Sequence, residues 1–437
     1  MKYNLINPTN DIQNSLEQIL INRGISQPFS NFLTPSFKSA NPYNKLDNID
    51  WGVQLLKKHL DMNSNIGIIV DSDCDGYLSA AILWLYIKII QPEANLFYLL
   101  HDGKEHGFSS EILKQMPKNT NLILSPDGGT NDYEEHKKLR EMGIDIIVLD
   151  HHEADRVSAD AVIINNQLSE NFPNKNLCGA AIVYKFCEAY DDIMGYGFAD
   201  DFLDLVAFAL VADMMDVRNF ETQLYIQEGI KFIKNEFLKK VVEKQSYSLK
   251  NEVTPIGIAF YIVPLINALI RVGEQKEKEV MFRALVDGNI LVPSSKRGHK
   301  PGDMEILTEQ ALRFATNAKS RQKKIQDSGV QTIRKIIEDN NLADNKILAI
   351  YIDEKILPKT LTGLVANKLT AIYKRPVLLL REPKVTTVDI NTINVDDCIE
   401  IDEILLQGSA RGYDRSDLKL FKDFVNQSDL FKYAEGK

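Results

Sequence analysis

Long apolar runs and closely paired cysteines are both lacking in this chain of 437 residues. No stretch of eighteen or more apolar residues occurs, and the first residues lack the composition of a signal peptide, so we expect neither a membrane span nor secretion. The four cysteines include no Cys-x-x-Cys spacing, which favours reduced thiols in a reducing compartment. These absences predict a soluble cytoplasmic protein, and the 44% of hydrophobic residues suffices for two or three domains.

An acidic turn at residues 71–76 follows an apolar run at residues 66–70. The run predicts a buried strand, and the glycine that ends the turn predicts the exit from it. Three aspartates occupy alternate positions, so their charges crowd together if the extended geometry continues past the strand. Carboxylates that repel in this way are usually neutralised by a hard divalent cation. The three are Asp71, Asp73 and Asp75.

Two simpler interpretations of the acidic turn remain open from this stretch alone. The Asp-x-Asp-x-Asp pattern also occurs in solvated loops and in calcium-binding loops. The calcium loop is disfavoured, because its twelfth position would need glutamate and is Ile82 in this chain.

Further predicted strands in the first half of the chain also end in residues that can bind metals. Because the carboxyl ends of parallel strands meet at one edge of an open α/β sheet, we expect these residues to lie together. The predicted strands are residues 94–100, 121–125 and 144–149, and the predicted helices are residues 80–90, 132–142 and 204–213. The residues at their ends are Asp127, Asp150, His151, His152 and Asp213.

Each of these residues has an ordinary structural explanation when taken alone. A single aspartate after a strand is often a helix N-cap, which would account for Asp127 or Asp132, and a histidine pair in a loop is often solvated. Four independent element ends with ligand chemistry favour a divalent metal site instead. The sequence therefore predicts an α/β fold with a parallel sheet and a metal site at one edge.

Four ordered segments resemble the motifs of the DHH phosphoesterase superfamily: residues 71–76 (DSDCDG), 126–129 (PDGG), 150–152 (DHH) and 211–213 (VAD). Within that superfamily the chain is most similar to the RecJ-type single-strand exonucleases, and the similarity extends over about residues 65–437. Three further segments favour this branch, namely residues 176–181 (NLCGAA), 264–271 (PLINALIR) and 408–411 (GSAR).

The resemblance implies a centre of two manganese ions, or of manganese and magnesium. It implies that Asp127 bridges the ions, that His152 faces the scissile phosphate and that Asp150 supports this pair. Two ions suit phosphodiester hydrolysis, because they lower the pKa of a water and stabilise developing charge on the reacting oxygens. The implied metal ligands are Asp71, Asp73, Asp75, Asp127, His151 and Asp213.

The resemblance also implies residues that hold the phosphates of the substrate strand. A guanidinium group matches a phosphate with its planar fork, and a glycine-rich turn can present its N–H groups. We expect residues 408–412 to form such a loop after a strand at residues 403–407. The implied contacts are Asn267, Arg271, Gly408, Ser409 and Arg411, with Lys104 and His106 as weaker ones.

Four regions are expected along the chain, namely residues 1–60, a helical preamble; 61–300, the DHH catalytic domain; 301–344, a connecting helix; and 345–437, a smaller α/β DHH-associated domain that binds substrate. The net charge of −10 suits a polyanion poorly, although bound ions would reverse the sign of the acidic centre. Residues 313–335 carry seven Lys or Arg against one Asp, which fits a solvated helix face and a phosphate-tracking surface equally.

The function expected from these features is metal-dependent exonuclease action on single-stranded DNA, by resemblance from the 5′ end, in repair, recombination or replication. The partner is then single-stranded nucleic acid, DNA rather than RNA, with no membrane partner. A DHH phosphodiesterase for oligoribonucleotides or cyclic dinucleotides is an alternative, and a non-catalytic replication scaffold is another. The three-aspartate first motif disfavours the former, and the complete ligand set disfavours the latter.

The chain departs from the family pattern near its end. The family usually continues into a Gly-Gly-His-x-x-Ala-Ala-Gly-like segment, which would begin where this chain stops at Lys437, and a further oligonucleotide-binding barrel is common. We therefore expect either a compact form, of the kind that a phage or mobile element carries, or a truncated chain.

Overall fold

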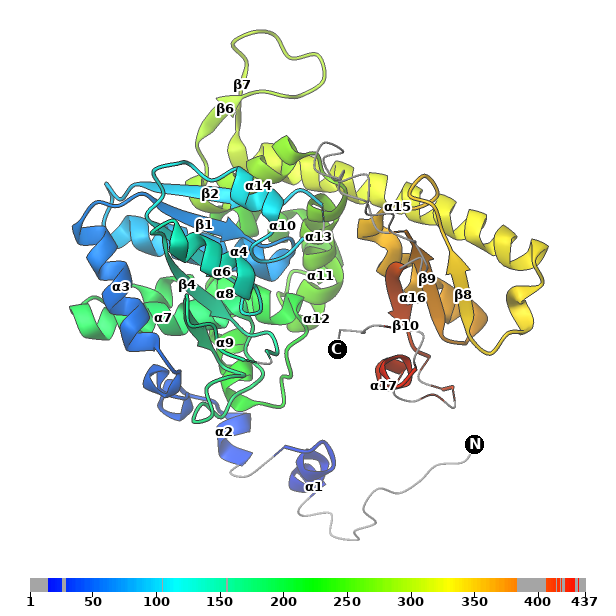
Figure 1. Cartoon of the computed structure of the whole chain (residues 1–437), viewed down its shortest axis with the longest axis horizontal. Helices are drawn as coiled ribbons and strands as arrows, with labels where there is room; N and C mark the ends of the chain where they lie inside the picture. Colours follow the sequence, from blue (N-terminus) through cyan, green and yellow to red (C-terminus); the bar gives the residue numbers. More distant parts are fainter. Residues whose placement is uncertain are drawn as a thin grey trace, which may run out of the picture. The chain divides into compact units, whose positions relative to one another are not determined.

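The structure is a computed structural model that describes residues 15–25, 29–103, 105–154, 156–382, 406–413, 415–416, 418, 421–428 and 431. By its internal contacts the chain divides into two compact units, Met1–Ala318 and Lys319–Lys437 (Figure 1). The 33-residue helix α15, Leu307–Asp339, runs through this division.

A five-stranded parallel sheet forms the centre of the first unit, which confirms the α/β fold class predicted from the sequence. Its strands are continuous apolar runs because both faces of the sheet are covered. Their order in the sheet is β2-β1-β3-β4-β5. The strands are β1 (Ile66–Val70), β2 (Leu96–Leu100), β3 (Leu122–Pro126), β4 (Asp145–Asp150) and β5 (Val162–Asn165).

Helices pack on both faces of this sheet and make three layers (Figure 1). Alternate strand residues serve the two cores: Ile68 and Val70 belong to the larger one, and Ile69 to the smaller one. The larger core contains residues of α3 (Ile49–Asp61), α4 (Cys74–Ile90) and α7 (Gly179–Met194), and the smaller core contains residues of α5 (Ser110–Lys114) and α6 (Tyr133–Glu141).

The order of the strands places a topological switch at β1. Strand β2 lies on one side of β1 and β3 lies on the other, so the chain leaves the two neighbouring strands β1 and β3 in opposite directions. Open α/β sheets bind ligands at such a point, outside the carboxyl ends of the strands. Asp71 directly follows β1, and Asp127 directly follows β3.

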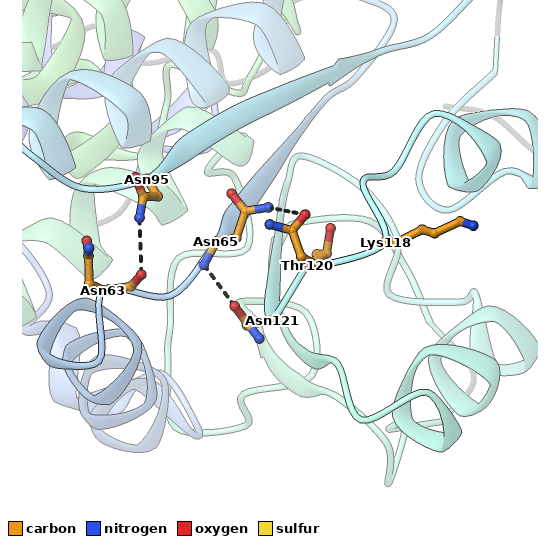
Figure 2. A pocket seen from close by; sticks show the side chains of 7 residues that line it. Asn63, Asn65, Asn95, Lys118, Thr120 and Asn121 are labelled. Carbon is orange, nitrogen blue, oxygen red and sulfur yellow. Dashed lines mark hydrogen bonds between the residues drawn. The ribbon is translucent and has the colours of Figure 1, made fainter.

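The opposite, amino-terminal edge of the sheet carries a polar hollow of about 530 Å³ (Figure 2). Its amides hold the strand starts together: the Asn65 N–H donates to Asn121 Oδ1 at 2.9 Å, and Asn95 Nδ2 donates to the Asn63 carbonyl at 3.2 Å. The lining contains neither carboxylates nor histidines, so this hollow offers no candidate for acid–base or metal chemistry.

Helices also complete the first unit around the sheet. They are α1 (Ser15–Asn22), α2 (Phe29–Leu33), α8 (Leu203–Ala212), α9 (Phe220–Lys231), α10 (Glu236–Lys244), α11 (Ser246–Leu249), α12 (Pro255–Gly257), the π-helical turn η5 (Ile258–Ile262), α13 (Val263–Val272) and α14 (Gln275–Asp287). Short 3₁₀ turns are η2 (Phe37–Ser39), η3 (Tyr43–Lys45) and η4 (Ala199–Phe202), and a hairpin of β6 (Leu291–Pro293) and β7 (Met304–Ile306) precedes α15. Among the described residues, one helical run, Pro255–Val272, is long and apolar enough to cross a membrane, and half of it is buried within the protein.

The second unit contains a three-stranded sheet in the order β10-β9-β8. Strands β8 and β9 are parallel, and β10 is antiparallel to β9. The elements are β8 (Leu348–Tyr351), η7 (Lys359–Leu361), α16 (Thr362–Tyr373), β9 (Val377–Arg381), β10 (Gln407–Arg411) and α17 (Phe421–Asn426), after the turn η6 (Leu342–Asp344).

The predicted phosphate-binding loop at residues 408–412 is wrong, because residues 408–411 lie within strand β10. Gly408 permits this pairing: a Cβ atom on it would lie 2.0 Å from the carbonyl oxygen of Leu379 in β9. The small residues that suggested a flexible turn therefore allow a close approach between two strands. Residues 403–405, the expected strand before this loop, lie outside the described residues.

Candidate metal centre

All eight residues predicted to form or support a metal site meet at the carboxyl edge of the first sheet. They fall into three overlapping groups, and within each group the potential ligand atoms lie within 4.8 Å of one another. The groups are Asp71, Asp73 and Asp127; Asp75, His151 and Asp213; and Asp127, Asp150, His151 and His152.

The acidic turn reaches the site by a different geometry from the one expected. Strand β1 ends at Val70, Asp73 is the extended N-cap of α4, and Asp75 lies in the first turn of that helix. The alternation of a strand therefore does not continue to Asp75. As a result Asp71 and Asp73 share one group of ligand atoms, whereas Asp75 belongs to another.

The N-terminus of α7 fixes the Asp75 carboxylate. The Gly179 N–H donates to Asp75 Oδ2 at 2.8 Å and the Ala180 N–H donates to Oδ1 at 3.0 Å. The first N–H groups of a helix have no partner within the helix and carry its positive end, so they stabilise a buried carboxylate. Asp75 is thereby oriented in the site.

Asp127 occupies a strained and buried position. Its φ angle of 65° lies in the left-handed region, which a side chain with a Cβ atom rarely adopts. Its Oδ1 is buried and accepts no hydrogen bond from the described residues. Gly179 packs directly on it, since a Cβ atom at that glycine would lie 2.5 Å from both Cβ and Oδ1 of Asp127. The fold thus holds a buried carboxylate oxygen whose lone pairs are available to a metal ion.

Three carboxylates surround one imidazole nitrogen. His151 Nε2 lies 3.2 Å from Asp127 Oδ1, 3.6 Å from Asp213 Oδ2 and 3.9 Å from Asp75 Oδ2. Asp75 lies in α4, Asp127 follows β3 and Asp213 is the C-cap of α8, so the three aspartates come from three different elements. Only the folded chain brings these atoms together.

Asp150 is engaged by hydrogen bonds on both of its oxygens. Its Oδ2 accepts from Thr130 Oγ1 at 2.6 Å, while its Oδ1 contacts His152 Nδ1 at 2.7 Å and accepts from the His151 N–H, also at 2.7 Å. Asn165 Nδ2 in turn donates to Thr130 Oγ1 and to the His152 carbonyl. With so many partners, Asp150 is suited to orient the His152 ring rather than to bind an ion itself.

The surroundings of the site raise the pKa of Asp127 and His152 and lower the pKa of Asp150. Burial, together with the neighbouring carboxylates Asp75, Asp73 and Asp71, raises the pKa of Asp127 well above its usual range. Although burial opposes both changes, the hydrogen-bonded pair of Asp150 and His152 lowers the pKa of Asp150 and raises that of His152 to about 9. At neutral pH His152 is therefore protonated in the metal-free protein.

The donor set fits hard divalent cations. Buried carboxylates that repel each other, a carboxylate oxygen without a partner and a neighbouring imidazole provide the oxygen and nitrogen ligands that manganese and magnesium accept. The residues that would hold such ions are Asp71, Asp73, Asp75, Asp127, His151 and Asp213.

Several known proteins are similar to this chain. The DHH family, N-terminal domain, matches residues 65–210. A Bacillus subtilis (strain 168) protein named "Putative SPbeta prophage-derived single-strand DNA-specific exonuclease YorK" is 42% identical over 436 residues, which cover 100% of this chain and 72% of that protein. "Single-stranded-DNA-specific exonuclease RecJ" of the same organism is 24% identical, over 83% of this chain and 44% of that protein. The chain is a RecJ-type member of the DHH family.

A solved structure of a RecJ protein has a similar fold to this chain. The crystal structure of RecJ from Thermus thermophilus in complex with Mn²⁺ aligns with a TM-score of 0.62 at 20% identity, covering 77% of this chain and 46% of that one. This chain spans less than half the length of either RecJ protein.

The predicted substrate contacts of this RecJ-type chain lie on several elements. Asn267 and Arg271 are partly exposed residues of α13 in the first unit. His106 contacts Asp71 Oδ2 through its Nδ1, so it adjoins the carboxylate cluster. Gly408, Ser409 and Arg411 belong to β10 in the second unit, and Lys104 lies outside the described residues.

Several neighbours of the cluster were missed from the sequence. His101 is buried, its Nε2 lies 3.8 Å from Asp71 Oδ1, and both of its ring nitrogens lack a partner among the described residues. Burial lowers the pKa of His101 to about 4, so it is neutral. His101 follows β2 and Asn165 ends β5. Both are polar residues at the end of a strand, which is the signal that identified Asp127 and Asp150, so the same signal could have identified them. Residues 176–181 were noted only as a family segment, and nothing in their local sequence identifies the N–H groups of Gly179 and Ala180 as partners of Asp75.

Proposed function

We propose that this chain is a metal-dependent exonuclease that hydrolyses phosphodiester bonds of single-stranded DNA, starting from the 5′ end. The observation that carries the proposal is the convergence of all eight DHH-motif residues at the sheet switch point. The relationship to proteins named as single-strand-specific exonucleases supports the substrate class. A role in DNA repair, recombination or replication inside the cell follows from such an activity.

Divalent cations, two manganese ions or manganese with magnesium, would supply Lewis-acid chemistry at the phosphate and acidify a water. The chain's own residues prepare the site for them. Asp71, Asp73, Asp75, Asp127, His151 and Asp213 would hold the cations, and Asp127 lies in two of the three ligand groups, which suits a bridge between ions.

His152 is the group that we assign to the reacting phosphate. Its Nδ1 is occupied by Asp150 Oδ1, and more than half of its side chain is exposed, so Nε2 is the ring nitrogen available to substrate. The raised pKa of about 9 favours a protonated ring at neutral pH. A protonated Nε2 can stabilise charge on the phosphate or donate its proton to the leaving oxygen.

The remaining assignments concern the substrate strand and the arrangement of the chain. Arg271 and Asn267, together with Ser409 and Arg411, would bind phosphates, as the RecJ resemblance implies. We assign residues 61–300 to the catalytic domain, 301–344 to the connection and 345–437 to substrate binding.

An end-labelled oligonucleotide tests the proposal. With Mn²⁺, the purified protein should shorten single-stranded DNA labelled at its 3′ end and leave blunt duplex DNA intact. A strand blocked at its 5′ end should resist degradation, and equal degradation of blocked and free strands would contradict the polarity. Faster hydrolysis of a dinucleotide RNA or of a cyclic dinucleotide than of single-stranded DNA would assign the site to small substrates instead.

A further inference from the structure

An exposed apolar stripe runs along the helical segment formed by α12, η5 and α13. Ile256 and Phe260 are each 71% exposed, and Tyr261 is 45% exposed. On the opposite side of the same segment Ile258 and Ile262 are fully buried in the core. The chain thus anchors this segment through one face and presents three large apolar side chains on the other.

The stripe is continuous with residues already predicted to contact the substrate. Positions 256, 260, 264, 267 and 271 are all exposed or partly exposed and recur every three or four residues, so they lie along one helical face. That face begins with Ile256 and Phe260 and ends with Asn267 and Arg271. A π-helical turn at Ile258–Ile262 interrupts the helix between them, and such turns are frequent at functional sites.

The helix that carries Arg271 contacts the helix that carries part of the carboxylate cluster. Helix α13 packs against α4, the helix that begins in the acidic motif. From Arg271 to Phe260 the face spans eleven residues, or about 16 Å. This length corresponds to about five stacked nucleotides at about 3.4 Å each.

A polymer with alternating chemistry matches this face. Arg271 and Asn267 suit phosphates, whereas Phe260 and Tyr261 offer the flat apolar rings on which nucleobases stack. A lipid bilayer fits less well, because the same face carries an arginine and an asparagine and half of the segment is buried within the protein.

We propose that Ile256, Phe260 and Tyr261 form a stacking surface for the bases of the single strand, a few nucleotides away from the phosphate that is cleaved. This inference rests on the proposed nuclease function and extends it to the recognition of the strand. Because the surface contacts bases through their flat faces, it binds single strands of any sequence and excludes a paired duplex, whose bases are already stacked.

Substitution of Phe260 tests the surface. Binding of a fluorescent ten-nucleotide single strand is measured in EDTA, where no cleavage occurs, for the wild type and for Phe260→Ala, Phe260→Leu and Phe260→Tyr. Loss of one stacked base predicts a Kd increase of about five- to one-hundred-and-fifty-fold for the alanine variant. The leucine variant should lose most of this affinity as well, and the tyrosine variant should retain it.

A matched control and a modified strand make the result specific. Phe232 is the C-cap of a different helix, α9, and is 76% exposed, so Phe232→Ala removes a similarly exposed ring outside the proposed surface and should leave the Kd unchanged. A strand whose third to sixth nucleotides are abasic should bind the wild type as weakly as it binds Phe260→Ala, because the ring then has no base to stack on.

The outcomes separate this inference from the proposed function. If the wild type neither binds nor shortens single-stranded DNA, the proposed function is wrong. The stacking surface is refuted if the wild type binds and shortens single-stranded DNA and Phe260→Ala binds the unmodified strand as tightly as the wild type does. It is also refuted if removal of the bases weakens binding to Phe260→Ala as much as it weakens binding to the wild type. A Phe260→Ala variant that instead changes only self-association or binding to lipid vesicles would assign the stripe to that occupant and overturn the inference.

Discussion

Replacement of Asp127 by asparagine should stabilise the metal-free protein and abolish its response to manganese. The Asp127 carboxylate is buried, shares its group with the Asp71 and Asp73 carboxylates and has an Oδ1 atom without a hydrogen-bond partner among the described residues. Without cations its negative charge has a large cost. Asparagine removes the charge and keeps the shape, so the folded state loses a repulsion and little else.

The size of the effect follows from two bounds. Two unit charges 4.8 Å apart repel by about 3.5 kcal/mol at an effective dielectric constant of about 20, and Asp127 has two such neighbours. The carboxyl can instead take up a proton, which costs about 1.4 kcal/mol for each pH unit above its ordinary pKa of 3.8, or about 6 kcal/mol at pH 8. We therefore expect Asp127→Asn to raise the free energy of unfolding by about 3 to 6 kcal/mol at pH 8 in EDTA.

The sign of the pH dependence is also determined. The folded-state pKa of Asp127 is raised, so both states are protonated at low pH and the charge has no cost there. The cost grows as the pH increases above the unfolded pKa. The stabilisation by Asp127→Asn should therefore be small near pH 4 and should increase towards pH 8.

Urea unfolding followed by tryptophan fluorescence measures this difference. Both tryptophans, Trp51 and Trp84, lie in the first unit, so the signal reports on the unit that contains the cluster. Saturating Mn²⁺ should stabilise the wild type, by about 2.7 kcal/mol at one hundred times the Kd, and should have little effect on the variant. Asp61→Asn, whose parent side chain is 62% exposed and pairs with the exposed Lys57, serves as the control and should differ from the wild type by no more than about 0.5 kcal/mol.

Two results would refute this reasoning. An Asp127→Asn protein that is less stable than the wild type at pH 8 in EDTA would mean that the carboxylate is not under repulsion. An equal gain in stability from Mn²⁺ in both proteins would remove Asp127 from the metal ligands.

Two further predictions concern the residues around the cluster. Gly179→Ala places a Cβ atom 2.5 Å from Asp127, so it should destabilise the protein by about 1 to 3 kcal/mol and weaken Mn²⁺ binding in calorimetric titrations. Gly197→Ala, at a position with no atom within 4 Å of the added Cβ, should do neither, and equal Mn²⁺ affinity in both variants would contradict the role of Gly179. Asp132→Asn should raise the free energy of unfolding in EDTA by about 1 to 2 kcal/mol at pH 8, because burial raises the pKa of Asp132 to about 6 and its charge is penalised above that pH. The gain should vanish below about pH 4 in urea titrations, and a gain that persists there would have a cause other than charge.

Short-range sequence features predicted much of the first unit correctly. The apolar runs that became β1, β3 and β4 are recognisable because a strand covered on both faces is apolar throughout. The residues after these strands were recognisable because their carboxylates and imidazoles suit metal ligation and have no apolar role. The four ordered motifs indicated the DHH superfamily and the three later segments indicated its RecJ-type branch, and the similarity to known proteins confirms both.

Predictions of local structure failed where the same residues are compatible with two different structures. Glycine and serine at residues 408–409 suggested a turn, but their small size serves the close pairing of β10 with β9. The alternation of Asp71, Asp73 and Asp75 suggested an extended segment, but α4 begins at Cys74 and divides the three between two groups. Local sequence gives no means of choosing between such uses, because the choice depends on partners distant in the chain.

The sequence by itself determined which residues have ligand chemistry and which strand or helix each one ends. The tertiary structure decided how they meet: the switch in strand order places Asp71 beside Asp127, and the N-terminus of α7 fixes Asp75. It also decided that Asp127 keeps an oxygen free of hydrogen bonds from the described residues and that His152 is oriented by Asp150. The physical reason is that the types of side chain and the local periodicity are properties of neighbouring residues, whereas electrostatic repulsion, burial and hydrogen bonding depend on distances that only the folded chain fixes.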